Sequence, residues 1–458
     1  MEFVHRPYSQ DETIAAIATP PGEGGIAIIR ISGKNSLSIA DSIFSGSVFS
    51  YSSHTAHLGK IFDKEGFTLD EVLLLVMKGP KSFTGDDTVE IHCHGGSVIT
   101  RKILERVLEA GAKMASPGEF SLRAFLNGKI DLAKAEAIQQ VISAKNEIAY
   151  QFAKNHLEGA LSRKIAQMQK DLLDIAAILE AAVDFPEESL EFASKEEILF
   201  SLSHILQNME SLSKTFYEGK MSHEGLNLCL VGPPNAGKSS LMNALLGKER
   251  AIVTEIAGTT RDVLEDNLYL GGLHFRIIDT AGIRETEERI EKEGIRRSKE
   301  AMQMADLVLL VLDASKPLCL ESINLLSTVS AEKTLLLWNK KDLPRVAFAP
   351  EFPSTQIDLS ALNHDGIEEL KKAIEHLIWK KGPPAKEEVV LTTLRHKKAL
   401  DEAMMLLQSV IKGLEEDISP EFLSFDMRKC LFELGTILGM NISEEILNSI
   451  FSKFCIGK

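Results

Sequence analysis

Hydrophobic and polar positions follow different periods in successive parts of this chain. Residues 1 to about 120 contain short apolar runs of the kind that form strands, separated by turn clusters such as residues 20–25 (PPGEGG). The runs that we predict as strands lie within residues 13–19, 26–32, 71–77 and 89–94. The first part of the chain is therefore expected to form an α+β domain.

From about residue 130 to residue 220 the pattern becomes helical. Apolar residues recur every three or four positions, as on one face of an amphipathic helix, at Leu157, Leu161, Ile165, Met168, Leu172, Ile175 and Ile178. A loop at residues 184–188 interrupts this pattern, which resumes over residues 198–212. After the Gly-Pro-Pro sequence at 382–384, helical periodicity returns over residues 394–411, 420–438 and 443–454, with Ser443 as a suitable N-cap.

Between these helical regions, residues 225–380 alternate between strand and helix patterns, which favours a parallel sheet. The simplest organisation is an α/β domain inserted into one helical domain, because the ends of an inserted domain usually lie close together. Two unrelated helical domains are the alternative. The expected fold is a multidomain α/β + α protein, with an N-terminal α+β domain (1–125), a helical domain in two parts (126–220 and 382–458) and an inserted P-loop domain with a mostly parallel sheet (221–381).

Composition narrows the class of protein. Hydrophobic residues make up 44% of the chain and charged residues 26%, as in ordinary globular proteins, and no run of about 18 apolar residues predicts a membrane-spanning helix. The five cysteines lack paired spacing and the N-terminus lacks a signal or transit pattern, so we expect a cytoplasmic protein with reduced thiols. The net charge of −15 argues against a generally basic nucleic-acid surface. If the protein serves RNA, local patches or a partner must supply most phosphate contacts.

The clearest chemical motif is a phosphate-binding loop in residues 226–241 (LNLCLVGPPNAGKSSL). Gly232 is followed after four residues by Gly237, Lys238 and Ser239, between a predicted buried strand and a predicted helix. In such a loop the backbone N–H groups converge on the phosphates, the lysine reaches the outer phosphates, and the hydroxyl can hold Mg²⁺.

Three further segments point to guanine as the base. Residues 279–282 (DTAG) follow a predicted strand, where a carboxylate suits the second shell of a nucleotide-bound Mg²⁺. Residues 339–342 (NKKD) end in Asp342, whose carboxylate can accept hydrogens from N1 and N2 of guanine, a donor pair that adenine lacks. Residues 360–362 (SAL) follow a short apolar stretch, where a backbone N–H could meet O6 of guanine. In this order and spacing the segments predict GTP binding.

Several motifs together carry a more specific resemblance. They are TPPG at 19–22 with Gly25 and Ile26, SFTGDD at 82–87, HGG at 94–96, PGEF at 117–120, GPPNAGKSSL in the phosphate loop and FCIGK at 454–458. From about residue 12 to the last residue, the chain resembles the MnmE (TrmE) family of tRNA-modification GTPases.

The resemblance implies a GTPase, a hydrolase that acts on GTP and takes part in modifying the wobble uridine of certain tRNAs. With a flavin-containing partner, MnmG (GidA), which carries FAD, the family adds an aminomethyl or carboxymethylaminomethyl group to C5 of that base. It implies a one-carbon tetrahydrofolate (5-formyl- or methylene-tetrahydrofolate) bound by the N-terminal domain, which also forms the homodimer, and Mg²⁺ and K⁺ at the nucleotide. No membrane partner is expected.

The resemblance also assigns residues to GTP hydrolysis. Ile283 stands where Ras-like proteins have the glutamine that orients water, and the family instead uses a glutamate that aligns with Glu291, with Glu288 or Glu293 as alternatives. The implied Mg²⁺ ligands are the hydroxyls of Ser239 and Thr260, and the implied K⁺ ligands are Asn235, Thr254, Ile256 and Thr259. The implied GTP contacts are Asn235, Ala236, Gly237, Lys238, Ser239, Ser240, Thr254, Glu255, Ile256, Ala257, Gly258, Thr259, Thr260, Asp279, Thr280, Ala281, Gly282, Asn339, Lys340, Asp342, Ser360, Ala361 and Leu362.

The implied folate contacts are Arg30, Glu90, Lys129 and the C-terminal Lys458. A buried carboxylate such as Glu90 can accept hydrogens from the amide-like donors of a pterin, and lysines suit the glutamate tail. Cys455 is either a nucleophile in the modification chemistry or a small buried residue, and the sequence leaves both open. The run at 92–94 (HCH) offers only three donors on one short strand, so a strand end is expected there rather than a zinc site.

A regulatory GTPase switch, for instance in ribosome assembly, is the alternative function. The N-terminal domain and the C-terminal CIGK distinguish the two, since a plain switch requires neither.

Overall fold

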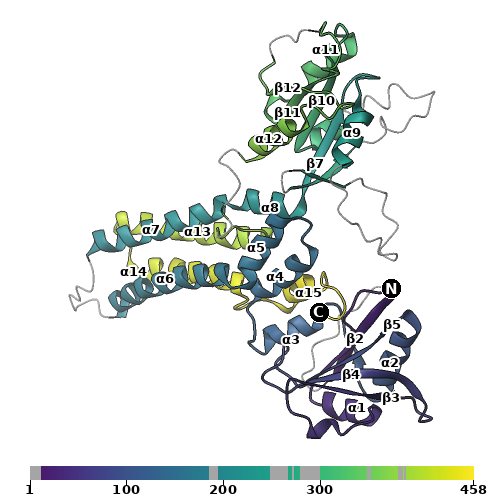
Figure 1. Cartoon of the computed structure of the whole chain (residues 1–458). Helices are drawn as coiled ribbons and strands as arrows, with labels where there is room; N and C mark the ends of the chain where they lie inside the picture. Colours follow the sequence, from purple (N-terminus) through teal and green to yellow (C-terminus); the bar gives the residue numbers. More distant parts are fainter. Residues whose placement is uncertain are drawn as a thin grey trace.

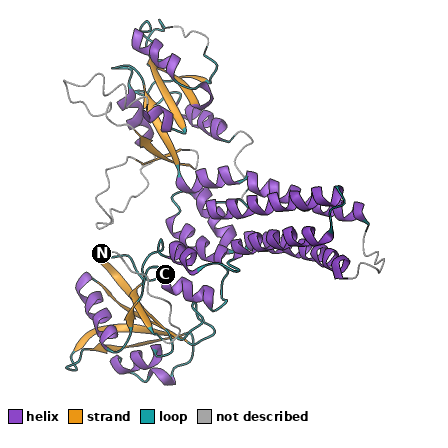
Figure 2. Ribbon diagram, turned by 180° about the vertical axis from the view of Figure 1, so that it is seen from behind, coloured by secondary structure: helices purple, strands orange, loops and turns teal. Residues whose placement is uncertain are grey.

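The structure is a computed structural model of the full chain, and it describes residues 12–184, 194–247, 267–270, 273–278, 300–347, 352–379, 385 and 388–458. A β-rich N-terminal domain and an α/β domain lie at opposite ends of the molecule, and a bundle of long helices lies between them (Figure 1). The same arrangement is seen from behind in Figure 2, where the C-terminal end of the chain lies beside the N-terminal domain.

The N-terminal domain is a six-stranded sheet with the strand order β3-β4-β5-β2-β1-β6. Its elements are β1 (Ile14–Ile17), β2 (Gly24–Ser32), α1 (Ser36–Ile43), η1 (Val48–Ser50), β3 (Thr55–Phe62), β4 (Thr68–Met77), β5 (Thr88–Gly95), α2 (Ser97–Glu109), β6 (Lys113–Met114) and α3 (Glu119–Leu126). One sheet face packs on α1 and α2 through fully buried residues such as Ile29, Leu74 and Ile91. The four predicted strands are confirmed as β1, β2, β4 and β5. Strand β3 was not predicted, because it has no continuous apolar run. It lies at the edge of the sheet, and along most of it partly buried residues alternate with exposed ones.

The helices before and after the inserted domain share one hydrophobic core. It contains the fully buried Leu172, Leu202, Leu407 and Leu434, one from each of the four long helices. The helices are α4 (Leu132–Ser143), α5 (Glu147–Leu157), α6 (Ala160–Asp184), α7 (Lys195–Lys214), α8 (Phe216–Glu224), α13 (Leu394–Glu415), α14 (Pro420–Leu438) and α15 (Glu444–Phe451).

The helices predicted over 198–212, 394–411 and 420–438 correspond to α7, α13 and α14, but α7 begins three residues earlier and α13 ends four residues later than predicted. Leu157 was predicted to begin the apolar face of the first long helix, and this is wrong: α5 ends at Leu157, which is 38% exposed, and Gly159 (φ +83°) separates it from α6. Ser443 is the N-cap of α15, as predicted, since its side chain accepts a hydrogen bond from the backbone N–H of Ile446. This last helix ends at Phe451, three residues earlier than expected.

The inserted domain is a second six-stranded sheet, with the order β12-β11-β10-β7-β9-β8. Its described elements are β7 (Leu226–Val231), α9 (Lys238–Leu246), β8 (Asn267–Leu270), β9 (Leu273–Ile278), β10 (Leu307–Asp313), α11 (Leu320–Thr328), η2 (Ala331–Lys333), β11 (Thr334–Asn339), β12 (Gln356–Asp358) and α12 (Ile367–Ile378). All neighbouring strands are parallel except β8 and β9, so the mostly parallel sheet is confirmed. The carboxyl ends of the parallel strands meet at one edge, where ligands bind in open α/β sheets.

In the part of the chain that the structure describes, none of the helices is long and apolar enough to cross a membrane.

Candidate functional site

The phosphate-binding loop lies between β7 and α9 and has no room for side chains at its glycines. A Cβ on Gly232 would lie 2.2 Å from the carbonyl oxygen of Val311, and a Cβ on Gly237 (φ +95°) would lie 2.1 Å from Nδ2 of Asn339. Lys238 folds back into the loop, where its Nζ donates to the carbonyl oxygens of Gly232 (2.8 Å) and Pro233 (2.9 Å). Burial lowers the pKa of Lys238. The loop thus surrounds the ammonium group of Lys238. Phosphate oxygens of a bound nucleotide can take the place of the two carbonyl oxygens as acceptors of its hydrogen bonds.

Asn339 joins the phosphate loop to the predicted base-binding segments. Its Nδ2 donates to the carbonyl oxygen of Ala236 (2.8 Å), and its Oδ1 accepts from the backbone N–H of Ala361 (3.0 Å). Asp342 Oδ1 accepts from the Ser360 hydroxyl (2.5 Å). We call this region, residues 232–240, 339–342 and 360–362, the nucleotide edge. The structure brings these three predicted segments together.

Lys340 pairs with a carboxylate that the sequence did not single out. Its backbone has a φ of +68°, and its Nζ lies 2.7 Å from Oδ2 of Asp313. Burial raises the pKa of Asp313, but hydrogen bonds from Lys340 and Ser315 outweigh this effect and lower it. Asp313 ends the apolar strand β10 and is the register partner of Asn339 at the end of β11. A carboxylate at the end of an apolar strand is the sequence feature by which Asp313 could have been found.

The other predicted nucleotide contacts are either exposed or outside the described residues. Asn235 (φ +61°), Ser239, Ser240 and Leu362 are exposed, and the two serines open the first turn of α9. The predicted residues Thr254, Glu255, Ile256, Ala257, Gly258, Thr259, Thr260, Asp279, Thr280, Ala281, Gly282 and Glu291, with the alternatives Glu288 and Glu293, lie outside the described residues.

A second candidate site joins the two ends of the chain. Arg30 on β2 is the register partner of Glu90 on β5, and its Nε donates to Glu90 Oε1 (2.8 Å). Its Nη1 donates to the carbonyl oxygen of Gly457 (3.2 Å), and its guanidinium lies 5.6 Å from the centroid of the Phe120 ring. We call Arg30, Glu90, Phe120 and residues 455–458 the tail site. Phe120 belongs to the predicted PGEF motif, but its position under the arginine was not foreseen.

The last four residues pack against the N-terminal domain. A Cβ on Gly457 (φ +92°) would lie 2.5 Å from the carbonyl oxygen of Ile17, so only glycine fits here without displacing backbone. The carbonyl oxygen of Cys455 accepts from the backbone N–H of Gly118 (3.4 Å), while the Cys455 residue is exposed. Burial, and then the positive charge of Arg30, lower the pKa of Lys458.

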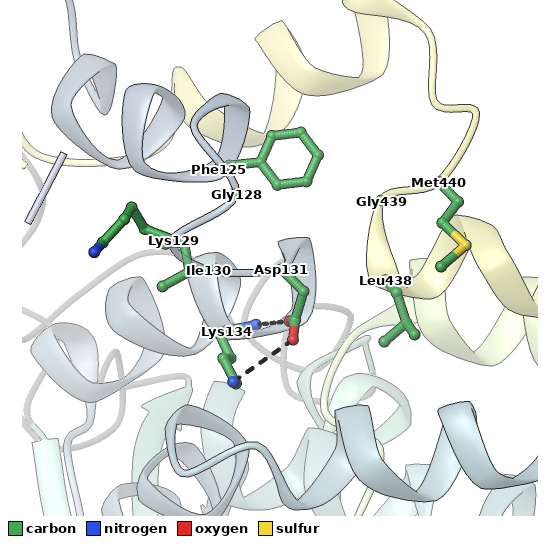
Figure 3. Close-up of a pocket in the computed structure, with 9 residues that line it drawn as sticks. All are labelled: Phe125, Gly128, Lys129, Ile130, Asp131, Lys134, Leu438, Gly439 and Met440. Carbon is green, nitrogen blue, oxygen red and sulfur yellow. Dashed lines mark hydrogen bonds and ion pairs between the residues drawn. The ribbon is translucent and has the colours of Figure 1, made fainter. Parts of the chain in front are cut away.

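Lys129 makes its contact in a neighbouring place. Its Nζ donates to the carbonyl oxygen of Pro80 (2.8 Å), just before the predicted segment 82–87. The turn that follows Lys129 borders a hollow of about 450 Å³, and on the other side of the hollow lie Leu438, Gly439 and Met440 (Figure 3). The Lys129 side chain points away from these three residues in this view. The structure thus brings together Arg30, Glu90 and the tail, whereas the contact of Lys129 is with another loop.

The three donors at 92–94 do not converge. Successive strand residues point to opposite faces, and Cys93 points into the core, where burial raises its pKa to about 11. His92 lies 3.3 Å from Glu90, and His94 Nδ1 lies 2.8 Å from Asp70. Among the described residues, no group of three His, Cys, Asp or Glu side chains is arranged to hold a metal ion.

Comparison with known proteins gives the family. The model for the MnmE helical domain matches residues 132–455, a range that includes the inserted domain, and the model for the GTP-binding protein TrmE N-terminus matches residues 13–129. The chain belongs to the MnmE family. The tRNA modification GTPase MnmE of Protochlamydia amoebophila (strain UWE25) is 59% identical over 100% of both chains. MnmE of Clostridioides difficile (strain 630) is 43% identical over 98% of this chain and 99% of its own length. The FeoB G domain of Methanococcus jannaschii is 27% identical over 33% of this chain and 97% of that chain, with a TM-score of 0.24.

Proposed function

We propose that this protein hydrolyses GTP and, with a flavin-containing partner, modifies C5 of the wobble uridine of certain tRNAs. The added group is aminomethyl or carboxymethylaminomethyl, and a one-carbon tetrahydrofolate supplies the carbon. The observation that carries this proposal is the tail site: Arg30 is bonded both to Glu90 and to the carbonyl oxygen of Gly457, 427 residues away in sequence. A GTPase that acts only as a switch needs no such site.

In the nucleotide edge, the positions of Lys238, Ser239 and Asp342 support the tasks that we propose for them. Lys238 exchanges its two loop carbonyl oxygens for phosphate oxygens, and Ser239 at the start of α9 offers its hydroxyl to Mg²⁺ together with Thr260. Asp342, next to Ser360, accepts the hydrogens of guanine N1 and N2. Asn235, with the carbonyl oxygens of Thr254, Ile256 and Thr259, would hold K⁺, which offsets charge that develops between the β and γ phosphates. Glu291 orients the attacking water.

In the tail site, Glu90 is largely buried and bears an ionic contact, so its carboxylate can accept hydrogens from a pterin ring. Lys458 and Lys129 supply positive charge for the glutamate tail of the folate. A bound one-carbon folate supplies the carbon that is transferred to the base. The exposed Cys455 belongs to this site, where a thiol can take part in the chemistry.

The homodimer is proposed on the sheet of the N-terminal domain. On the face opposite α1 and α2, Leu58 of β3 and Leu73 of β4 are register partners and are 70% and 47% exposed, and Ile26 of β2 is 67% exposed. Exposed apolar groups in neighbouring strands are typical of an interaction surface. The Arg30–Glu90 pair lies on the same face, which would put the tail site near the interface.

We also propose domain boundaries at residues 125, 220 and 381 and a cytoplasmic location for the protein.

The test is mass spectrometry of wobble nucleosides in tRNA from cells that lack this protein, with and without a copy of its gene. We expect the modified uridine to disappear and to return with the gene. An unchanged nucleoside profile together with a defect in ribosome assembly would favour the regulatory switch instead.

A further inference from the structure

The segment that leaves the inserted domain, residues 388–393, is clamped by side chains of the helical domain. Val390 and Leu391 are fully buried. His156 Nε2 donates to the carbonyl oxygen of Val390 (2.8 Å), and the backbone N–H of Leu391 donates to the Thr215 hydroxyl (3.0 Å). Because a carbonyl oxygen can only accept, Nε2 of His156 carries the hydrogen. We call residues 388–393 the connector.

The connector runs directly into an ionic cluster between α13 and α4. Arg395 donates to both carboxylate oxygens of Glu136, from Nε (2.9 Å) and from Nη2 (2.8 Å), and His396 Nε2 lies 2.7 Å from the same carboxylate. Burial raises the pKa of Glu136, but His396 and Arg395 outweigh it and lower the pKa to about 2. One turn further along α4, Gln140 hydrogen-bonds to Thr392 of the connector (2.9 Å).

Arg395 also holds the end of a third helix. Its Nη1 donates to the carbonyl oxygen of Thr436 (2.6 Å), and Nη2 donates to that of Ile437 (3.1 Å). These carbonyls belong to the last turn of α14, where the Thr436 carbonyl oxygen also accepts from the backbone N–H of Gly439 (3.2 Å). The next residue but one is Gly439 (φ +94°), whose added Cβ would lie 2.6 Å from the Phe125 ring. Thus the end of α14 lies against α3 with little freedom to shift.

Both elements that Arg395 holds lead to predicted folate contacts. Helix α4 starts at Leu132, immediately after its N-cap Asp131, and Lys129 lies just before that cap. Helix α14 leads through α15 to the tail, and Phe451 and Phe454 pack with Leu132 in one buried cluster. Figure 3 shows the turn after Lys129 and the end of α14 facing each other across the hollow.

We propose that Arg395 is a positioning residue that couples the inserted domain to the tail site. Through Glu136 it holds the start of α4, and through the carbonyl oxygens of Thr436 and Ile437 it holds the end of α14. Any displacement of the connector that a bound nucleotide produced would therefore reach Lys129 and residues 455–458 together. The role of the tail site rests on the proposed function. A lysine cannot replace the guanidinium fork, because a single ammonium cannot reproduce its bidentate geometry while also serving two carbonyl oxygens.

The position of the tail can be read from the reactivity of Cys455. Of the five cysteines, Cys93, Cys229 and Cys430 are buried, so a Cys319→Ser background leaves Cys455 as the exposed thiol. The measurement is the rate of alkylation of the full-length protein by iodoacetamide, with and without a non-hydrolysable GTP analogue. We expect the two rates to differ by about fivefold or more in this background, and the ratio to fall close to one in Arg395→Gln and in Arg395→Lys.

Arg428→Gln is the matched control, because Arg428 lies on α14, the helix that Arg395 contacts from α13, but it forms an exposed pair with Glu180 (3.4 Å). It should keep the full ratio. The proposal is overturned if the parent protein binds the analogue with a rate ratio of one, if both Arg395 variants keep the parental ratio, or if Arg428→Gln loses it equally. Should Arg395→Gln fail to fold, Arg395→Lys decides the question.

Binding of the GTP analogue and of 5-formyltetrahydrofolate is measured separately by titration calorimetry. Absence of folate binding would reject the proposed folate site, while the thiol readout would still support or overturn the coupling through Arg395. Absence of nucleotide binding would reject the proposed GTP hydrolysis and the coupling through Arg395, but not the folate site.

Discussion

The nucleotide edge and the tail site are built in opposite ways. The nucleotide edge uses three short segments that follow strands of one sheet, and Asn339 alone bonds to both of the other segments. The tail site joins β2, β5 and the end of the chain, and the tail reaches it only because α15 and the helices before it are packed in place. The first site therefore depends on one domain, whereas the second depends on the packing of two. A substitution far from the tail site should therefore disturb the tail site more than an equally distant substitution disturbs the nucleotide edge.

The largest expected effect is on the tail site alone. Deletion of residues 455–458 removes the Gly457 carbonyl that Arg30 binds and the ammonium of Lys458. We expect wobble-uridine modification to fall by more than about 100-fold, because even a small misplacement of reacting groups can reduce a rate by about 100-fold. GTP hydrolysis should stay near normal. Modification is measured by nucleoside mass spectrometry and hydrolysis by phosphate release. Cys455→Ser keeps the tail and separates the thiol from the docking. Normal modification in the truncated protein would mean that the two ends share no functional site.

Glu291→Ala tests the proposed GTP hydrolysis from the side of its chemistry. A group that orients water acts in the transition state, so we expect GTP turnover to fall by about 100-fold with nearly unchanged nucleotide affinity. Single-turnover hydrolysis and equilibrium titration give the two quantities. Wild-type turnover would direct attention to Glu288 or Glu293, and a parallel loss of affinity would show that Glu291 supports binding instead.

Potassium dependence tests the same region from the side of its ions. GTP turnover should be about tenfold faster in K⁺ than in Na⁺ at equal ionic strength, because an ion of the wrong size stabilises the developing phosphate charge less well. Asn235→Ala should remove most of this difference. Equal rates in the two salts for the unmodified protein would exclude the site.

A smaller effect is expected from adding one methyl group to the tail. In Gly457→Ala the new Cβ meets backbone atoms of Ile17 and Ala18, so the tail must shift, and we expect modification to fall several-fold, about as a loss of 1 kcal/mol would produce. Gly66→Ala is the matched control, because Gly66 has a similar φ of +87° but no atom within 4 Å of the added Cβ. Equal loss in both variants would attribute the effect to backbone strain in general rather than to docking of the tail.

The smallest effect concerns the connector between the two sites. Burial lowers the pKa of His156 from 6.5 to about 4. As the pH falls below 6.5, the unfolded chain therefore binds a proton that the folded protein does not, and the free energy of unfolding decreases. Between pH 6.5 and pH 5.5 this contribution is about 1 kcal/mol. His156→Gln keeps a donor for Val390 but does not titrate, so its urea unfolding should depend less on pH, while the exposed His204→Gln should behave like the parent. An unchanged pH dependence in His156→Gln would show that His156 is not buried in its neutral form.

Short-range patterns predicted much of this fold because they report periodicity and local backbone needs. The residues of the phosphate loop, the N-cap Ser443 and the span of α14 could be read from neighbouring residues alone. The edge strand β3 could not, because an edge strand needs no continuous apolar run. Leu157 was assigned to the wrong helix because the break at Gly159 leaves the three-to-four spacing intact.

The sequence by itself determined the fold class, the family and the local shape of the nucleotide edge, since these depend on residues close together in the chain. Only the tertiary structure decided that Asp313 pairs with Lys340, that Phe120 lies under Arg30, and that Arg395 holds α4 and the end of α14 at once. The physical reason is that such contacts join residues 27 to 259 positions apart, whose proximity is set by how whole helices and sheets pack. No local spacing records that packing.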